Sequence, residues 1–137
     1  MCLPGARALV ALTVGSLLIA AACHQPAAPG SNARFRIHDD TPDTYRVEIS
    51  RSASVVQADS LQRSQLPRWV VGTPQAGDGG YNAPWNWHLE PSSVFFAEVT
   101  IEACQTNARL LEASLSYWLS YPLRQVCVWG TVDARER

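Results

Sequence analysis

Residues 34–49 read Arg-Phe-Arg-Ile-His-Asp-Asp-Thr-Pro-Asp-Thr-Tyr-Arg-Val-Glu-Ile, and their alternation predicts the fold class. Phe35 and Ile37 share one face of a strand, and their charged neighbours share the other. Residues 39–43 supply turn chemistry, and residues 45–49 alternate again. The stretch therefore predicts a β-hairpin with one face against a core and one face in water.

The rest of the chain predicts two helices and further strands. A helix over residues 52–64 can begin at a Ser52 or Ser54 cap, and its buried side is formed by Val55, Val56, Ala58 and Leu61. Strands are expected over residues 69–71, 85–90, 94–102 and 126–132, with a loop over 73–84 and a second helix over 107–120. These elements predict an α+β domain, a mostly antiparallel sheet of about six strands packed by two helices, in the order ββαβ-ββαβ.

The first 22 residues are typical of an export signal. Arg7 precedes an apolar run over residues 8–22, which is short for a membrane span but suits a secretory signal. Small residues before Cys23 resemble the lipobox of bacterial lipoproteins, in which the cysteine becomes the lipidated first residue, although Ala20 stands where that motif usually has leucine. Ala20 and Ala22 also fit an ordinary signal peptidase site, so free secretion is the alternative.

The cysteine count favours the lipoprotein. Removal of the signal leaves Cys23, Cys104 and Cys127, an odd number for an exported protein. Lipid on Cys23 frees the other two to form a structural disulfide across the second helix. We expect a flexible tether over residues 23–32, a single domain over 33–133, and a lipid anchor in the cell envelope, at the outer membrane of a Gram-negative cell.

The composition excludes several classes of function. The 137 residues include 11 basic and 12 acidic ones, for a net charge of −1, and every basic residue is arginine. The lack of lysine excludes Schiff-base and phosphate-loop lysine chemistry, and the near-neutral charge argues against nucleic acid as a partner. The common hydrolase, metalloprotease and dinucleotide-binding motifs are also missing, so we expect no cofactor and no metal.

One segment gathers most of the chemically informative side chains. Residues 77–91 combine glycines, an asparagine, three aromatic residues, a histidine and a carboxylate. The segment resembles a family of small exported bacterial domains, calmodulin-binding-protein-like and shared with the N-terminal domain of a slime-mould protein. The family pattern Gly-Phe/Tyr-Asn-x-Pro-Trp-x-Trp/Phe-His-Leu-Asp-Pro matches residues 80–91. Further matches are Phe96, Glu98, Ile101, Glu102, Cys104, Cys127 and Trp129.

The resemblance extends upstream through residues 45–49 and so covers nearly all of residues 33–133. It supports the domain boundary and the disulfide, and it implies no established enzymatic activity. Gln105 and Val128 depart from the pattern, where the family often has Asp and Pro. The first departure removes an acid beside Cys104.

The segment allows three functional hypotheses. In a non-enzymatic recognition domain, which we favour, the contacts to an unknown protein or small ligand come from Tyr81, Asn82, Trp85, Trp87 and His88. A small metal- or His/Glu-dependent enzyme would use His88, Glu90 and Glu98. A secreted inhibitor of an extracellular enzyme would use the loop over residues 73–84.

A structural interpretation competes with each of these roles. His88 can be a half-buried strand residue, hydrogen-bonded to Glu98 or to the backbone, that orients a hairpin. The tryptophans can belong to the core, because a domain of about 100 residues needs most of its large aromatic side chains there.

Overall fold

A computed structural model describes residues 32–137, and the long strand β8 organises them. The elements are β1 (Ala33–Asp39), β2 (Thr44–Ile49), α1 (Ser52–Ser64), β3 (Arg68–Gly72), β4 (Pro74–Ala76), β5 (Trp87–Leu89), β6 (Phe95–Ala97), a 3-10 turn (Glu102–Cys104), β7 (Gln105–Thr106), α2 (Ala108–Ala113), α3 (Leu115–Ser120) and β8 (Val126–Glu136). The predicted α+β class is confirmed. No helix within residues 32–137 is long and apolar enough to span a bilayer.

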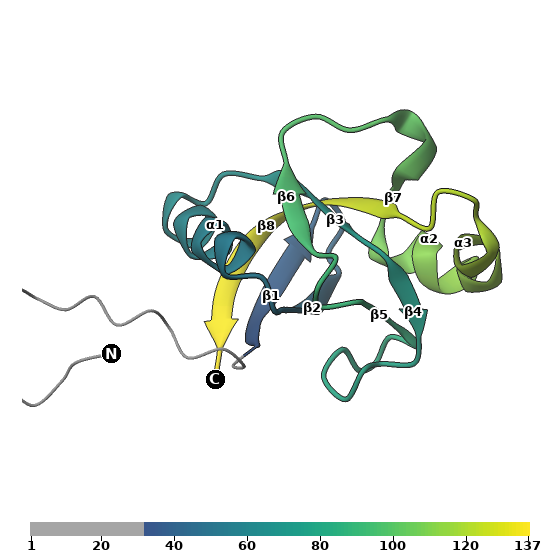
Figure 1. The fold of residues 1–137 in the computed structure, drawn as a ribbon, viewed down its shortest axis with the longest axis horizontal. Coiled ribbons are helices and arrows are strands. Elements are labelled where there is room, and N and C mark those ends of the chain that lie inside the picture. Colours follow the sequence, from purple (N-terminus) through teal and green to yellow (C-terminus); the bar gives the residue numbers. More distant parts are fainter. Residues whose placement is uncertain (1–31) are drawn as a thin grey trace, which may run out of the picture.

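The main sheet has the strand order β2-β1-β8-β3-β6, and all of these pairs are antiparallel (Figure 1). The first half of β8 lies between β3 and the short parallel strand β7, and its second half pairs with β1. Gly130 sits where β8 changes partner. A Cβ atom there would lie 2.7 Å from the Ile37 side chain and 2.8 Å from the His38 carbonyl oxygen, so the close approach of β1 requires glycine.

The core lies on one face of this sheet. Alternate residues of the β1–β2 hairpin are fully buried: Phe35, Ile37, Tyr45, Val47 and Ile49. Each aliphatic or phenylalanine side chain buried in this way contributes about 1.5–3 kcal/mol. The opposite face of the hairpin is wet and is crossed by ion pairs between Arg34 and Glu48 and between Arg46 and Glu136.

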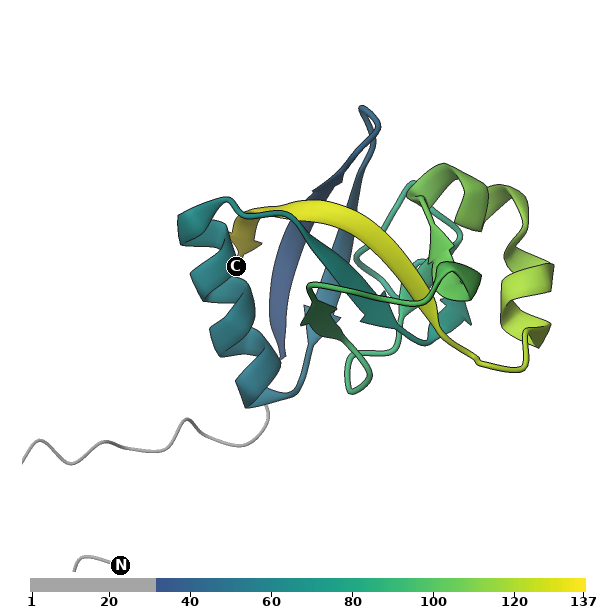
Figure 2. The same cartoon turned by 90° about the horizontal axis from the view of Figure 1, so that it is seen from above.

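The helices cover two ends of the sheet. Helix α1 lies near the end of β8, whereas α2 and α3 lie at the other side of the domain with β4 and β5, which form a separate two-stranded sheet (Figures 1 and 2). The main core joins these layers through Ala58 of α1, Leu111 of α2 and Trp118 of α3.

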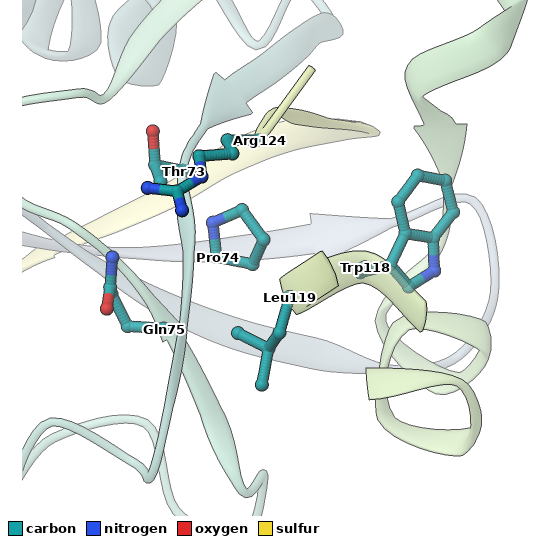
Figure 3. Close-up of a pocket in the computed structure, with 6 residues that line it drawn as sticks. All are labelled: Thr73, Pro74, Gln75, Trp118, Leu119 and Arg124. Carbon is teal, nitrogen blue, oxygen red and sulfur yellow. The ribbon is translucent and has the colours of Figure 1, made fainter. Parts of the chain in front are cut away.

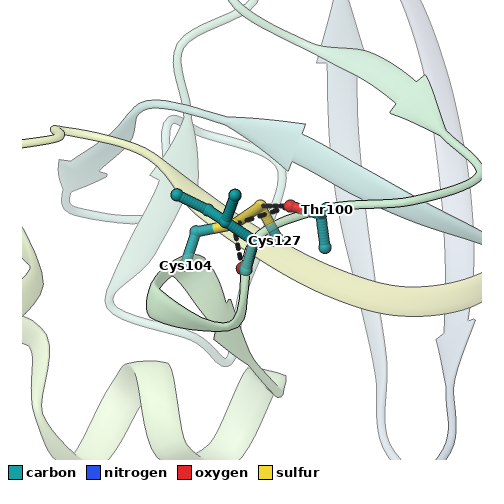
Figure 4. The surroundings of a disulfide bond; sticks show 4 residues. Thr100, Cys104 and Cys127 are labelled. Atoms are coloured by element: carbon teal, nitrogen blue, oxygen red, sulfur yellow. Dashed lines mark hydrogen bonds between the residues drawn. A yellow bond between two sulfur atoms is a disulfide. The ribbon is translucent and has the colours of Figure 1, made fainter.

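The predicted disulfide is confirmed. Cys104 and Cys127 are bonded, with their Cα atoms 5.1 Å apart, and the bond fastens the 3-10 turn to β8 (Figure 4). The Thr100 hydroxyl lies 2.8 Å from one sulfur and 2.9 Å from the other. Both cysteines pack with Val71 in a small cluster apart from the main core.

The first helix follows its predicted span but not its predicted cap or apolar side. Arg51 occupies the N-cap position and makes no side-chain capping bond, so neither Ser52 nor Ser54 is the cap. Ser54 is buried instead, beside Ala58 and Leu61. Val56, expected on the buried side, is 67% exposed.

Several later elements also differ from the prediction. The strand expected over 94–102 ends at Ala97, because its partner β3 begins at Arg68, directly after Pro67. The expected second helix bends at Ser114, which directs α3 toward β4 and divides the helix in two. The last strand, expected near 126–132, continues to Glu136. The expected loop over 73–84 contains β4, and the strand expected over 85–90 is shortened to β5.

Candidate binding site

The loop between β4 and β5, residues 77–86 and here called the motif loop, covers the outer edge of β2. The Asn82 side-chain oxygen accepts a hydrogen bond from the Arg46 backbone N–H at 2.6 Å. The Trp85 indole N–H donates to the Thr44 carbonyl oxygen at 2.8 Å. Edge strands expose such groups to pairing with other chains, so these side chains do for β2 what a further strand would do.

Asn82 and Trp87 therefore have structural positions. Asn82 is fully buried, and its side-chain amide also donates to the Trp87 carbonyl oxygen at 2.7 Å. Trp87 is fully buried as well, with its ring centroid 5.5 Å from that of Tyr45. Neither residue presents surface to a ligand, so the prediction that Asn82 and Trp87 contact a ligand is wrong.

Tyr45 and Trp87 share an unusual feature at this contact. The Tyr45 hydroxyl and the Trp87 indole nitrogen are buried and have no hydrogen-bond partner within residues 32–137. Burial raises the pKa of Tyr45 well above its ordinary value of 10.0, and the charge of Asp39 adds to the shift. An unpartnered buried hydroxyl costs stability, which makes Tyr45 a useful position for a test.

His88 holds the motif loop from the other side. Its Nδ1 atom lies 2.7 Å from the Gly77 carbonyl oxygen, so the Nδ1-protonated tautomer donates a hydrogen bond there. Its ring packs edge-on to Tyr81, with the centroids 5.9 Å apart. Gly79 faces both rings at a φ of 64°, and a Cβ atom there would lie 2.8 Å from Tyr81 and 2.9 Å from His88. His88 thus orients the hairpin through the backbone, as the structural interpretation expected.

Tyr81 is half-buried and neutral. Its hydroxyl donates to the Leu89 carbonyl oxygen at 3.2 Å, and the Arg34 guanidinium lies 5.0 Å from its ring centroid. Burial raises the pKa of Tyr81 to about 12, and the negative charge of Glu48 contributes to the rise. Tyr81 and Trp85, both half-buried, are the predicted contact aromatics that keep some exposed surface.

The three residues of the enzyme hypothesis have separate partners. His88 bonds to Gly77, the Glu90 carboxylate accepts from the Ser92 hydroxyl, and the Glu98 carboxylate accepts from Arg68. The Glu98 side chain is 77% exposed and follows β6 of the main sheet, whereas His88 lies in β5 of the two-stranded sheet. Within residues 32–137, no group of three or more His, Cys, Asp or Glu side chains is placed to hold a metal ion.

A pocket lies between β4 and α3, and it joins the start of the loop expected over 73–84 to helix residues that the sequence assigned to no site. Its volume is about 220 Å³, and it is lined by Thr73, Pro74, Gln75, Trp118, Leu119 and Arg124 (Figure 3). The side chains of Thr73, Gln75 and Arg124 surround Pro74, with Leu119 opposite, whereas the Trp118 indole points away from them. This β4–α3 pocket therefore has a polar rim and a small apolar wall.

Arg124 carries the positive charge of the pocket. Six other arginines are held in ion pairs, namely Arg34, Arg36, Arg46, Arg68, Arg109 and Arg135. The Arg124 guanidinium pairs with no carboxylate among residues 32–137, and its backbone has a φ of 46°. The sequence signal for this site is slight, a lone Pro-Leu-Arg after the second helix, because the bend at Ser114 brings the parts together.

A second hollow is larger but less suited to a ligand. It has a volume of about 520 Å³ and is lined by His38, Gln65, Thr131 and Asp133. Asp133 is already paired with Arg36 at 2.6 Å, and the Gln65 amide donates to the Val132 carbonyl oxygen. Its most strongly polar groups are therefore occupied.

A match to a known family covers the described domain. The family model for the BP-74 N-terminal domain matches residues 31–136. The chain belongs to this family. The match includes every strand and helix from β1 to β8, and thus both the motif loop and the β4–α3 pocket of this BP-74 N-terminal domain. Neither a search among curated proteins nor one among solved structures found a match.

Proposed function

We propose that the chain is an exported, lipid-anchored protein whose domain recognises a ligand and catalyses no reaction. Residues 1–31, which hold the predicted signal, Cys23 and most of the tether, lie outside the described residues. The disulfide between Cys104 and Cys127 supports export, because such bonds form and persist in oxidising compartments. The Pro-Trp-x-Trp-His-Leu motif supports a relationship to calmodulin-binding-protein-like domains. We propose that the domains are related and do not propose that they share a binding partner.

The β4–α3 pocket carries the recognition function. It combines an apolar wall with polar side chains and one unpaired guanidinium, which supports recognition of a small ligand that carries both an apolar and a charged group. We therefore assign the ligand contacts to this pocket and not to the motif loop, where the sequence predicted them. The polar atoms of the half-buried aromatics are already hydrogen-bonded, that of Tyr81 to Leu89 of β5 and that of Trp85 to Thr44 of β2.

The position of the pocket suits a tethered domain. The start of β1 pairs with the end of β8, and both lie at the α1 side of the molecule, whereas α3 lies at the opposite side (Figures 1 and 2). A tether that enters at β1 would leave the pocket facing away from the membrane. A ligand outside the membrane could then reach it.

The two alternatives have less support. His88, Glu90 and Glu98 share no site, which removes the arrangement that the enzyme hypothesis needs. For an inhibitor, the motif loop would have to present a side chain that anchors in the target enzyme. Its exposed tip is instead rich in glycine, at residues 77, 79 and 80, and the side chains of Tyr81, Asn82 and Trp85 are hydrogen-bonded to β5 and β2.

The test uses thermal unfolding of the purified protein with the small-molecule and peptide fraction of the envelope. A ligand at about 100 times its Kd adds about 2.7 kcal/mol to the free energy of unfolding, which raises the Tm of a domain of this size by roughly 10 °C. The rise should be lost in Leu119→Glu, which places a carboxylate in the pocket, and kept in Leu110→Glu, a matched exposed position on α2. Equal shifts in both variants, or none in the parent protein, would contradict the proposal.

A further inference from the structure

We infer that the β4–α3 pocket binds a carboxylate attached to a small aliphatic group, as at the C-terminus of a peptide that ends in leucine. This inference rests on the proposed recognition function and names its ligand class. The same chemistry is offered by a free branched-chain carboxylic acid. The two sources differ only in whether a peptide chain continues beyond the carboxylate-bearing residue.

The charge of the pocket selects an anion. Arg124 is the cation among the six lining residues, and the lining contains no carboxylate to neutralise it. A guanidinium presents a planar fork of donors that matches the two oxygens of a carboxylate. Thr73 and Gln75 stand on the same rim, and neither side chain is hydrogen-bonded to another residue of the described domain, so both have free donors.

The backbone at Arg124 is a second and independent observation. Its φ of 46° lies in the left-handed region, which glycine adopts without strain and arginine rarely adopts. The turn is closed by a hydrogen bond from the Arg124 N–H to the Tyr121 carbonyl oxygen at 2.9 Å. Strained residues of this kind gather at ligand-binding positions, and Arg124 lines the same pocket as Pro74 (Figure 3).

The size of the pocket limits the ligand to one small group. Its 220 Å³ is below the roughly 300–1,000 Å³ of sites for drug-sized molecules, yet above the roughly 150 Å³ of a cavity known to hold benzene. Pro74 is buried and Leu119 is 38% exposed, so the apolar wall can cover an aliphatic side chain. A terminal residue with its carboxylate on Arg124 fits both limits.

Calorimetric titration of the mature protein in detergent tests the inference. The probes are N-acetyl-leucine, its uncharged counterpart N-acetyl-leucinamide, 4-methylpentanoate, and the peptide acetyl-Ala-Ala-Leu. We expect the acid to bind at least about tenfold more tightly than the amide, since the amide cannot form the charged pair. Tighter binding of the peptide than of 4-methylpentanoate assigns the source to peptide ends, and equal binding assigns it to free acids.

Two substitutions at Arg124 separate binding from folding. Arg124→Gln should weaken binding of the acid about tenfold or more and leave binding of the amide unchanged. Arg63→Gln removes an equal charge on α1 and should change the affinity for neither probe. Arg124→Gly relieves the strain of the left-handed backbone conformation, so the variant should keep or raise the Tm. It should no longer bind the acid.

The outcomes distinguish this inference from the function on which it rests. Equal binding of acid and amide, or full binding by Arg124→Gln, would overturn the carboxylate assignment and leave recognition at the pocket intact. The carboxylate assignment also fails if no probe binds while the envelope fraction still raises the Tm through Leu119. If neither the probes nor the fraction acts at the pocket, both the inference and the proposed function fail.

Discussion

Asn82→Ala tests whether the motif loop is a structural cover for β2. The substitution removes two hydrogen bonds, one from the Arg46 backbone N–H at 2.6 Å and one to the Trp87 carbonyl oxygen at 2.7 Å. Because Asn82 is fully buried, water does not replace them. Each group left unpaired costs about 1–3 kcal/mol, so the free energy of unfolding should fall by about 2–6 kcal/mol.

Urea unfolding, followed by tryptophan fluorescence, measures this loss. A domain of this size has a total stability of about 5–15 kcal/mol, so the midpoint should fall clearly. Asn86→Ala is the matched control in the same loop, since its exposed side chain bonds only to Glu112, and it should cost no more than about 1 kcal/mol. Equal effects of the two substitutions, or a loss below about 1 kcal/mol at Asn82, would refute the structural role.

Individual side chains give three further predictions. Tyr45→Phe removes a buried hydroxyl that has no partner in the described domain, so it should raise the free energy of unfolding by about 1 kcal/mol. Tyr81→Phe removes the hydrogen bond to the Leu89 carbonyl oxygen, so it should lower the free energy of unfolding. Urea unfolding measures both changes. The Asn32 side chain, and then Arg34, hold the pKa of Glu48 below its ordinary 4.5. The contribution of ionised Glu48 to the free energy of unfolding should therefore be present above about pH 4.5 and be lost as the pH falls through the folded-state pKa. Glu48→Gln should make the free energy of unfolding less dependent on pH in this acid range. An unchanged pH dependence in the variant would contradict the assignment. Cys23→Ser should move the protein from the membrane fraction to the soluble fraction in cell fractionation, and an unchanged distribution would contradict the lipid anchor.

Local patterns were sufficient to predict part of the fold. The β1–β2 hairpin and the span of α1 follow from periodicities that lie within a few residues, and tertiary packing does not override them. The disulfide followed from the parity of the cysteines in an exported chain. Where the pattern misled, the cause was a missing partner: the apolar residues Val99 and Ile101 continue the alternation of β6, but no strand of the described domain lies beside them, and both are exposed.

The candidate site could not be predicted because its contacts are non-local. The polar atoms of Asn82 were correctly singled out, but their partner Arg46 lies 36 residues away, on the edge of a sheet whose strand order the sequence leaves open. A side chain that satisfies such an edge is indistinguishable, in sequence, from one that awaits a ligand. The β4–α3 pocket depends on the bend at Ser114 and the turn at Arg124, neither of which has a periodic signal.

Recognition at the β4–α3 pocket rather than at the motif loop can be tested in a single titration. Backbone amide NMR shifts of the ¹⁵N-labelled protein are mapped as it is titrated with the envelope fraction that raises its Tm. We expect shifts at Gln75, Leu119 and Arg124, with the motif-loop tip and Trp85 unaffected. Shifts centred on Tyr81, Ala83 and Trp85, with Leu119 and Arg124 unchanged, would place recognition at the motif loop and contradict the proposed function.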